Sequence, residues 1–163
     1  LITSLFFMIE IERKFLVISD RYRVEASKKS TIAQGYLNSH PERSVRIRLN
    51  DQKGSMTVKG KSNQSGLSRF EWEKEISKTD AETLLGLCEK TIIRKTRHEV
   101  SVGNHLFEVD EFEGLNAGLV IAEVELSAEN DVFSKPSWLG QEVTGDVRYY
   151  NSNLSKHPFC DWE

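Results

Sequence analysis

Strict alternation of apolar and charged residues recurs along most of this chain and limits the folds that it can adopt. In segment 44–50 (SVRIRLN), three aliphatic residues alternate with Arg46 and Arg48. Successive side chains of a β-strand point to opposite faces, so this pattern predicts a strand with one apolar and one charged face. On the same basis we expect strands at 9–17, 32–38, 44–50, 55–61, 69–76, 91–102, 106–112 and 119–126.

Short turns join most of these expected strands. Residues 51–54 (DQKG) and 103–104 (GN) are typical of hairpin turns. A short helix or a turn region is expected at 20–29. Helices are expected from the capping box 79–82 (TDAE) to about residue 90, and late in the chain at 137–143 and 149–156. Strands joined by turns, with the helices mainly late, indicate an antiparallel sheet that is closed or nearly closed.

The first expected strand carries a dense set of charges. Within residues 10–14 (EIERK), Glu10, Glu12 and Lys14 share one face, while Arg13 shares the other face with apolar neighbours. We interpret the face with two carboxylates and one ammonium as an interior working surface. Arg13 is then expected in the outer shell, where its role is structural.

Charged residues of the other strands occupy alternate positions and separate by sign. The acids are Glu10, Glu12, Glu71, Glu73, Glu108, Asp110, Glu123 and Glu125, and the bases are Lys14, Arg46, Arg48, Lys59, Arg69, Lys95 and Arg97. Two arrangements fit this pattern. The charges line either the outer face of a β-sandwich, as weak surface ion pairs, or the interior of a barrel.

Charge inside a barrel is tenable only where it is paired, hydrated or bound to ions. Carboxylate oxygens suit hard cations such as Mg²⁺ or Mn²⁺, and arginine and lysine suit phosphate oxygens. The barrel interpretation therefore predicts a site for a metal-bound polyanion and the chemistry of phosphoryl transfer.

Size and composition narrow the class of protein. The 163 residues suffice for one domain with a full core, and a net charge of −3 gives no sign of a nucleic-acid or anionic-membrane partner. Cys88 and Cys160 form no paired motif, so we expect a reducing, cytoplasmic setting. Residues 1–7 are too short an apolar stretch for a signal peptide or a membrane span. We expect them to be an appendage before a start at Met8.

The motif Glu10-x-Glu12-x-Lys14, followed by the later pairs in the same order, resembles the CYTH domain family, the triphosphate tunnel metalloenzymes. The resemblance covers residues 8–158, and the tail 143–151 (VTGDVRYYN) is similar to that of bacterial members. It implies an α+β, mainly antiparallel fold: an eight-stranded closed β-barrel with flanking helices. We expect a single domain at 8–163.

The resemblance also implies roles for individual residues. Glu10, Glu12 and Glu125 would bind the metal that accompanies the triphosphate, and Glu71, Asp110 and Glu123 would bind a second metal and serve catalysis. The phosphate cradle would comprise Lys14, Arg46, Arg48, Lys59, Lys95 and Arg97. Arg148 would add a late basic contact or stand exposed at a helix start. Arg69, Glu73 and Glu108 would share the tunnel face.

The implied activity is hydrolysis of inorganic tripolyphosphate to pyrophosphate and phosphate, with Mg²⁺ or Mn²⁺ as cofactor. No nucleophile elbow or triad is present in the sequence, which favours direct attack by water. The alternatives are a class IV-type adenylyl cyclase, a thiamine or nucleoside triphosphatase, and a polyphosphate-binding module without catalysis. The expected partner is a small triphosphate, with no nucleic acid and no membrane, and a homodimer is left open.

Overall fold

A computed structural model describes residues 9–162 of the chain, so the predicted appendage at 1–7 and Met8 lie outside the described residues. The strands are β1 (Ile9–Val17), β2 (Lys28–Asn38), β3 (Arg43–Asn50), β4 (Lys53–Ser62), β5 (Ser68–Ile76), β6 (Ile93–Val102), β7 (His105–Phe112), β8 (Val120–Glu125) and β9 (Leu139–Glu142). The helices are α1 (Tyr22–Glu25), α2 (Lys78–Leu85) and α3 (Asn151–Leu154), with 3₁₀ turns η2 (Gly114–Asn116), η3 (Val147–Tyr149) and η4 (Phe159–Asp161).

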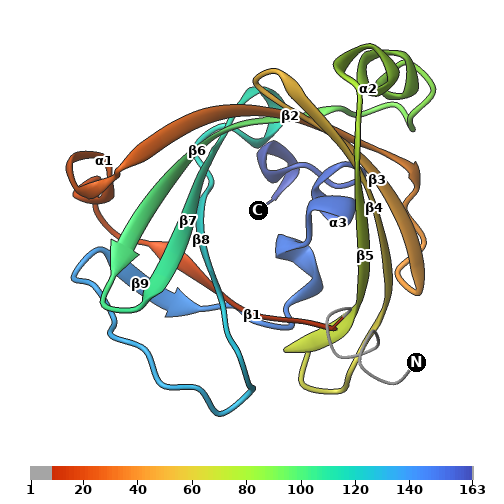
Figure 1. Cartoon of the computed structure of the whole chain (residues 1–163). Coiled ribbons are helices and arrows are strands. Elements are labelled where there is room, and N and C mark those ends of the chain that lie inside the picture. The colour runs from red at the N-terminus through yellow and green to blue at the C-terminus, as the bar shows by residue number, and fades with distance from the viewer. Residues whose placement is uncertain (1–8, 163) are drawn as a thin grey trace.

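The strands form one antiparallel sheet that closes on itself. Their order is β5-β4-β3-β2-β6-β7-β8-β1, and β1 pairs with β5 to complete the ring. At the closing seam Ile9 lies opposite Phe70, and Glu10 lies opposite Arg69. Figure 1 shows the ring end-on. The predicted eight-stranded closed barrel is thus confirmed.

The expected helix at 137–143 is wrong, because part of this segment is strand β9. β1 pairs with β5 only through residues 9–11, and β9 pairs with the same edge farther along, at Phe15 and Val17. The unpaired backbone groups of an edge strand readily accept another strand. The backbone N–H of Val143 continues this contact by donating to Lys14 O at 2.8 Å.

Helix α2 begins earlier and ends earlier than the capping box predicts. Its N-cap is Ser77, whose hydroxyl accepts from the Asp80 N–H at 3.0 Å. The serine has extended backbone angles and satisfies one of the free N–H groups of the first turn, as an N-cap residue does. The helix is followed by a turn, and the Glu89 N–H donates to Tyr36 O at 2.8 Å on β2.

Two apolar cores stabilise the barrel, one on its outside and one within it. The outer core packs Phe15, Phe107 and the fully buried Trp138 against the far faces of β1, β6, β7 and β8. The inner core contains Ile93, Phe112, Leu119, Ile121, Val143, Tyr149 and Leu154. Because α3 and the C-terminal segment lie within the ring (Figure 1), they supply part of this inner core.

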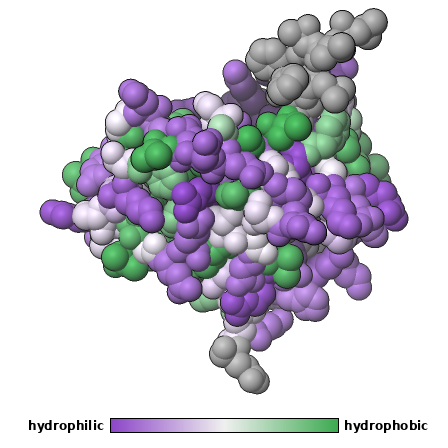
Figure 2. Space-filling view, turned by 90° about the horizontal axis from the view of Figure 1, so that it is seen from below, coloured by the Kyte–Doolittle hydropathy of each residue, from purple (hydrophilic) through white to green (hydrophobic). Residues whose placement is uncertain are grey.

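The outer surface is mainly polar. Hydrophilic residues cover most of the face shown in Figure 2, and apolar residues gather in small groups between them. Among residues 9–162, no helix has the length and apolar character needed to cross a bilayer.

Candidate active site

A cavity of about 660 Å³ lies inside the barrel and is lined mainly by charged side chains of the barrel strands. Of the residues predicted from the sequence, it brings together Glu10, Glu12, Lys14, Arg46, Arg48, Lys59, Arg69, Glu71, Glu73, Arg97, Glu108, Glu123 and Glu125. The charged faces of these strands therefore point inward, and the β-sandwich with external charges does not describe this chain.

Strands β1 and β8 form an acidic wall with one embedded lysine. Glu12 lies directly opposite Glu125, and Lys14 lies opposite Glu123. The Lys14 ammonium forms an ion pair with Glu123 and lies 3.5 Å from Glu12 Oε1. Burial opposes charge on both groups, but the mutual attraction raises the pKa of Lys14 and holds that of Glu123 well below its usual range.

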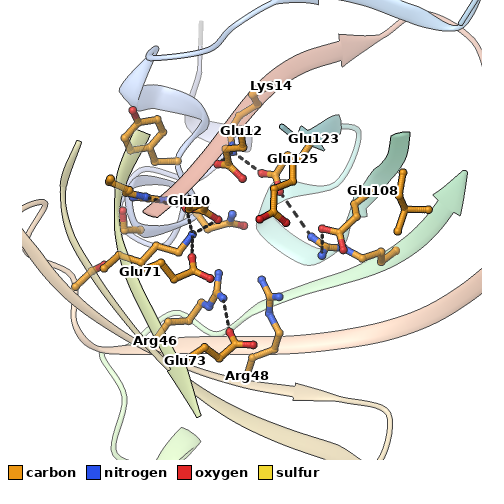
Figure 3. Close-up of a pocket in the computed structure, with 18 of the residues that line it drawn as sticks. Glu10, Glu12, Lys14, Arg46, Arg48, Glu71, Glu73, Glu108, Glu123 and Glu125 are labelled. Atoms are coloured by element: carbon orange, nitrogen blue, oxygen red, sulfur yellow. Dashed lines mark hydrogen bonds and ion pairs between the residues drawn. The ribbon is translucent and has the colours of Figure 1, made fainter. Parts of the chain in front are cut away.

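Glu125 differs from its neighbours because it has no cationic partner among residues 9–162. Partial burial raises the pKa of its carboxyl group, and the nearby carboxylates of Glu10 and Glu71 add to that effect. In Figure 3 the side chain reaches toward the centre of the cavity. A carboxylate among carboxylates is stabilised when a cation binds between them.

The closing seam of the barrel carries a second charged cluster. Lys59 on β4 donates to Glu10 Oε2 at 2.7 Å and lies 2.7 Å from Glu71 Oε2. Arg69 donates to the same Glu10 oxygen at 3.2 Å. Burial alone would raise the pKa of Glu71, and Lys59 lowers it instead. Side chains of β1, β4 and β5 thus share their charges at the seam.

Arg97 on β6 is held by acids from β7. Its Nε and Nη2 donate to the two oxygens of Asp110, each at 2.7 Å, and Nη1 forms an ion pair with Glu108. The fully buried Lys95 also forms an ion pair with Asp110. Burial lowers the pKa of Lys95 to about 8, against the opposing effect of Asp110. Lys95 and Asp110 do not line the cavity: Asp110 is bonded to Arg97, and Lys95 lies over the Phe112 ring of the inner core.

Arg46 and Arg48 extend from β3 on the wall opposite the acidic strands (Figure 3). Arg46 Nη2 donates to Thr57 Oγ1 at 3.1 Å and lies 3.5 Å from Glu73 Oε2. Arg48 is held by the side-chain oxygen of Gln34 on β2. The two guanidinium groups face the cavity from one strand, as the alternation in 44–50 predicts.

Two further arginines, one within the first motif and one in the tail, lie away from the cavity. Arg148 is largely exposed, forms an ion pair with Asp146 at 2.6 Å, and lies over the Trp162 ring. The predicted phosphate contact from Arg148 therefore has no support in its position, and the alternative of an exposed arginine near a helix start describes it better. Arg13 faces outward and forms an ion pair with Glu142 on β9.

Several cavity residues carry no charge pattern and were missed by sequence reasoning. Tyr36 lies on the inward face of β2, and Tyr150 and Asn151 enter from the C-terminal segment. His105 follows a hairpin turn and Asp131 lies in a loop. At such positions alternation along a strand does not predict which way a side chain points. Only Tyr36 had a usable signal, because it shares the parity of Gln34 and Ile32 on the same strand.

The donor chemistry of the acidic wall fits a divalent cation. Within residues 9–162, no three His, Cys, Asp or Glu side chains already converge in the geometry of a metal site. The available oxygens nevertheless belong to carboxylates on one wall, and Glu125 lacks a cationic partner while its ionisation is opposed by other acids. Oxygen donors of this kind suit Mg²⁺ and similar hard ions.

Comparison with known proteins finds relatives of similar sequence and similar architecture. The CYTH domain model matches residues 8–156. An inorganic triphosphatase of Acetivibrio thermocellus is 50% identical over 155 residues, covering 94% of this chain and 97% of the relative. An inorganic triphosphatase of Nitrosomonas europaea is 38% identical over 153 residues, covering 91% and 97%. The crystal structure of the inorganic triphosphatase NE1496 superposes with a TM-score of 0.62 at 34% identity, covering 90% of this chain and 93% of that one.

Proposed function

The chain belongs to the CYTH domain family, and from this membership we propose that it is an inorganic triphosphatase that hydrolyses tripolyphosphate to pyrophosphate and phosphate. The observation that carries the proposal is the cavity wall itself. Guanidinium groups of Arg46 and Arg48 lie on one side, and the carboxylates of Glu12, Glu123 and Glu125 lie on the other (Figure 3).

The cationic wall would bind the phosphate chain. Arg46, Arg48 and Arg97 offer planar donor groups that match phosphate oxygens, and Lys59 adds a point charge. These groups would stabilise the charge that develops on the terminal phosphoryl group while its bond to the bridging oxygen breaks. The water oxygen would form the new bond to phosphorus, and pyrophosphate would leave.

The acidic wall would hold metal. The family is a class of enzymes that need a divalent metal, and we propose Mg²⁺ or Mn²⁺ here. A bound ion of this kind neutralises phosphate charge and lowers the pKa of a water molecule. Glu10, Glu12 and Glu125 would hold the ion next to the substrate, and Glu71, Glu123 and Asp110 are proposed for a second ion. The role of Asp110 would require Lys95 and Arg97 to release its oxygens.

The cellular location of the enzyme is proposed from its two cysteines alone. Cys88 and Cys160 are both free thiols, as in a reducing compartment, and we propose a cytoplasmic location. A homodimer stays a prediction that sedimentation analysis would check.

The test is a phosphate-release panel with tripolyphosphate, ATP and thiamine triphosphate under Mg²⁺ and Mn²⁺, with cyclic AMP measured in the ATP sample. We expect tripolyphosphate to be turned over with the highest kcat/KM. Faster turnover of another triphosphate, formation of cyclic AMP, or tight binding without turnover would overturn the proposal in favour of a different triphosphatase, a cyclase or a binding module.

Adjacent residues of β1 provide a matched control for the panel. Glu12→Ala removes an inward carboxylate and should lower turnover by roughly 10²-fold or more while the protein stays folded. Arg13→Ala changes the next residue, which faces outward, and should leave turnover close to that of the wild type. Near-wild-type turnover in Glu12→Ala would refute the role assigned to the acidic wall.

A further inference from the structure

Arg48 differs from the other cations that line the cavity. Each of Lys14, Arg46, Lys59, Arg69 and Arg97 lies within ion-pairing distance of a carboxylate oxygen. Arg48 has no such partner among residues 9–162, and no dashed line joins it to a carboxylate in Figure 3. It is also partly exposed to the cavity, whereas Arg46 and Arg97 are only 8% and 5% exposed.

A neutral amide holds Arg48 in place. Gln34 lies opposite Arg48 in the β2–β3 register. Its Oε1 accepts hydrogen bonds from Arg48 Nε at 3.1 Å and from Nη2 at 3.0 Å. A guanidinium only donates, so the oxygen end of the amide must face it. The remaining N–H donors of the arginine are left for a ligand in the cavity.

The amide of Gln34 costs the folded protein some stability. Gln34 is fully buried, and its Nε2 has no hydrogen-bond partner among the described residues. A buried donor without a partner is unfavourable, and a glutamate of the same size would bond Arg48 at least as strongly. The other arginines that line the cavity each lie within ion-pairing distance of a carboxylate, so the neutral side chain at position 34 stands out.

We propose that Gln34 is a positioning residue that keeps Arg48 oriented but without an ion-pair partner, so that Arg48 is the first docking point for the phosphate chain. A triphosphate could bind Arg48 without first breaking an ion pair, whereas the other cavity cations must exchange a carboxylate for phosphate. This inference rests on the proposed function, because it assumes a polyphosphate ligand.

The electrostatic surroundings of Arg48 support the same view. Burial lowers the pKa of its guanidinium to about 10, and the nearby Arg46 and Arg97 act in the same direction, while the more distant carboxylates of Asp110 and Glu108 oppose them only in part. The group is still charged at neutral pH, and its charge is destabilised until an anion arrives. Binding a polyanion there relieves repulsion among three guanidinium groups.

The test compares two substitutions of nearly equal size. Gln34→Glu keeps the acceptor but adds a charge that pairs with Arg48, and Gln34→Met removes the acceptor without adding charge. We expect Gln34→Glu to melt at the wild-type temperature or above, and to raise the KM for tripolyphosphate about tenfold or more. Gln34→Met should raise KM less and melt lower.

A purely structural role predicts the opposite ranking. Gln34→Glu would then be silent and Gln34→Met would be the harmful change, and that result would overturn the inference. A double-mutant cycle adds a second check, because Gln34→Met should cost no further affinity once Arg48→Met has removed the guanidinium. The surface substitution Gln52→Glu adds the same charge on the exposed hairpin and should leave KM unchanged.

Direct binding separates this inference from the proposed function. Calorimetric titration with tripolyphosphate in the presence of EDTA measures docking without turnover. If the wild type binds tripolyphosphate but does not hydrolyse it, the proposed function fails and the ranking of the position-34 variants still tests Gln34. If the wild type hydrolyses tripolyphosphate and Gln34→Glu changes neither KM nor binding by more than twofold, the inference about Gln34 fails alone.

Discussion

The two halves of the barrel interior have opposite chemistry although the same strands build both. On β6, Ile93 precedes the inward-facing Lys95 and Arg97, and on β8, Ile121 precedes Glu123. β7 and β1 make the same change in the other chain direction, from Asp110 to Phe112 and from Lys14 to Leu16. Each of these four strands keeps its inward parity and changes from charged to apolar along its length.

This difference separates the work of folding from the work of binding. The apolar half is filled by the C-terminal segment and gains stability from burial. The charged half surrounds a cavity, where several acids and bases are held near one another without a ligand. Groups arranged for a ligand commonly reduce stability, so substitutions in the two halves should have opposite consequences for stability and activity.

Among substitutions in the charged half, Glu125→Gln should cause the largest loss of activity. This carboxylate lies among other acids without a cationic partner, and it belongs to the proposed metal ligands. We expect turnover to fall by roughly 10³-fold or more. The melting temperature in EDTA should rise, because a neutral amide replaces a carboxylate that its neighbours repel. Phosphate release and thermal melting measure the two effects.

A melting temperature that falls together with turnover would contradict this expectation. It would mean that Glu125 supports the fold. A matched control is Glu113→Gln, which neutralises an acid that does not line the cavity. That variant should retain turnover.

The apolar half should respond in the reverse sense to Leu154→Ala. Leu154 is fully buried in the inner core, and its truncation leaves a cavity. We expect the free energy of unfolding to fall by about 3 kcal/mol, while KM and turnover per folded molecule stay within twofold. Urea denaturation measures the loss. Leu115→Ala, at a side chain that is 55% exposed, should cost far less.

Alternation predicted the direction of most side chains but not their depth in the barrel. Period 2 put Asp110 and Lys95 on the inward face, yet both are buried next to the inner core and neither lies on the cavity wall. Depth depends on strand register and on what fills the barrel end, and neither can be read from one strand alone. The polarity of Gln34 likewise gave no sign of its role, because that role depends on the strand register that places it opposite Arg48.

The C-terminal segment was the least predictable part. Its turn-rich sequence shows no clear period, so the sequence suggested a helix where β9 forms, and it left open whether Arg148 contacts the phosphate or stands exposed, as it does. β9 exists because β1 has a free edge beyond Ile11, which is a consequence of how the barrel closes. Long-range pairing of this kind overrides local propensity.

Outside the barrel, the ion pair between Arg13 and Glu142 should matter least. The two side chains are 26% and 33% exposed, and exposed pairs contribute up to about 1 kcal/mol. We expect Arg13→Gln to lower the free energy of unfolding slightly at pH 7 and to leave turnover unchanged. Arg13 also lies over the Phe133 ring, which glutamine would cover less well.

The pH dependence of this small effect identifies its origin. The Arg13 hydrogen bond lowers the pKa of Glu142 in the folded protein. The pair therefore contributes its full stability above the ordinary glutamate pKa, near 4.5, and loses it as the pH falls through the lowered value. The difference between wild type and Arg13→Gln in urea denaturation should be largest at pH 7 and shrink toward pH 3. A difference in unfolding free energy that does not change with pH would assign the loss to packing on Phe133. A large fall in turnover with unchanged melting would show that Arg13 serves the cavity and that its assignment to the outward face of β1 is wrong.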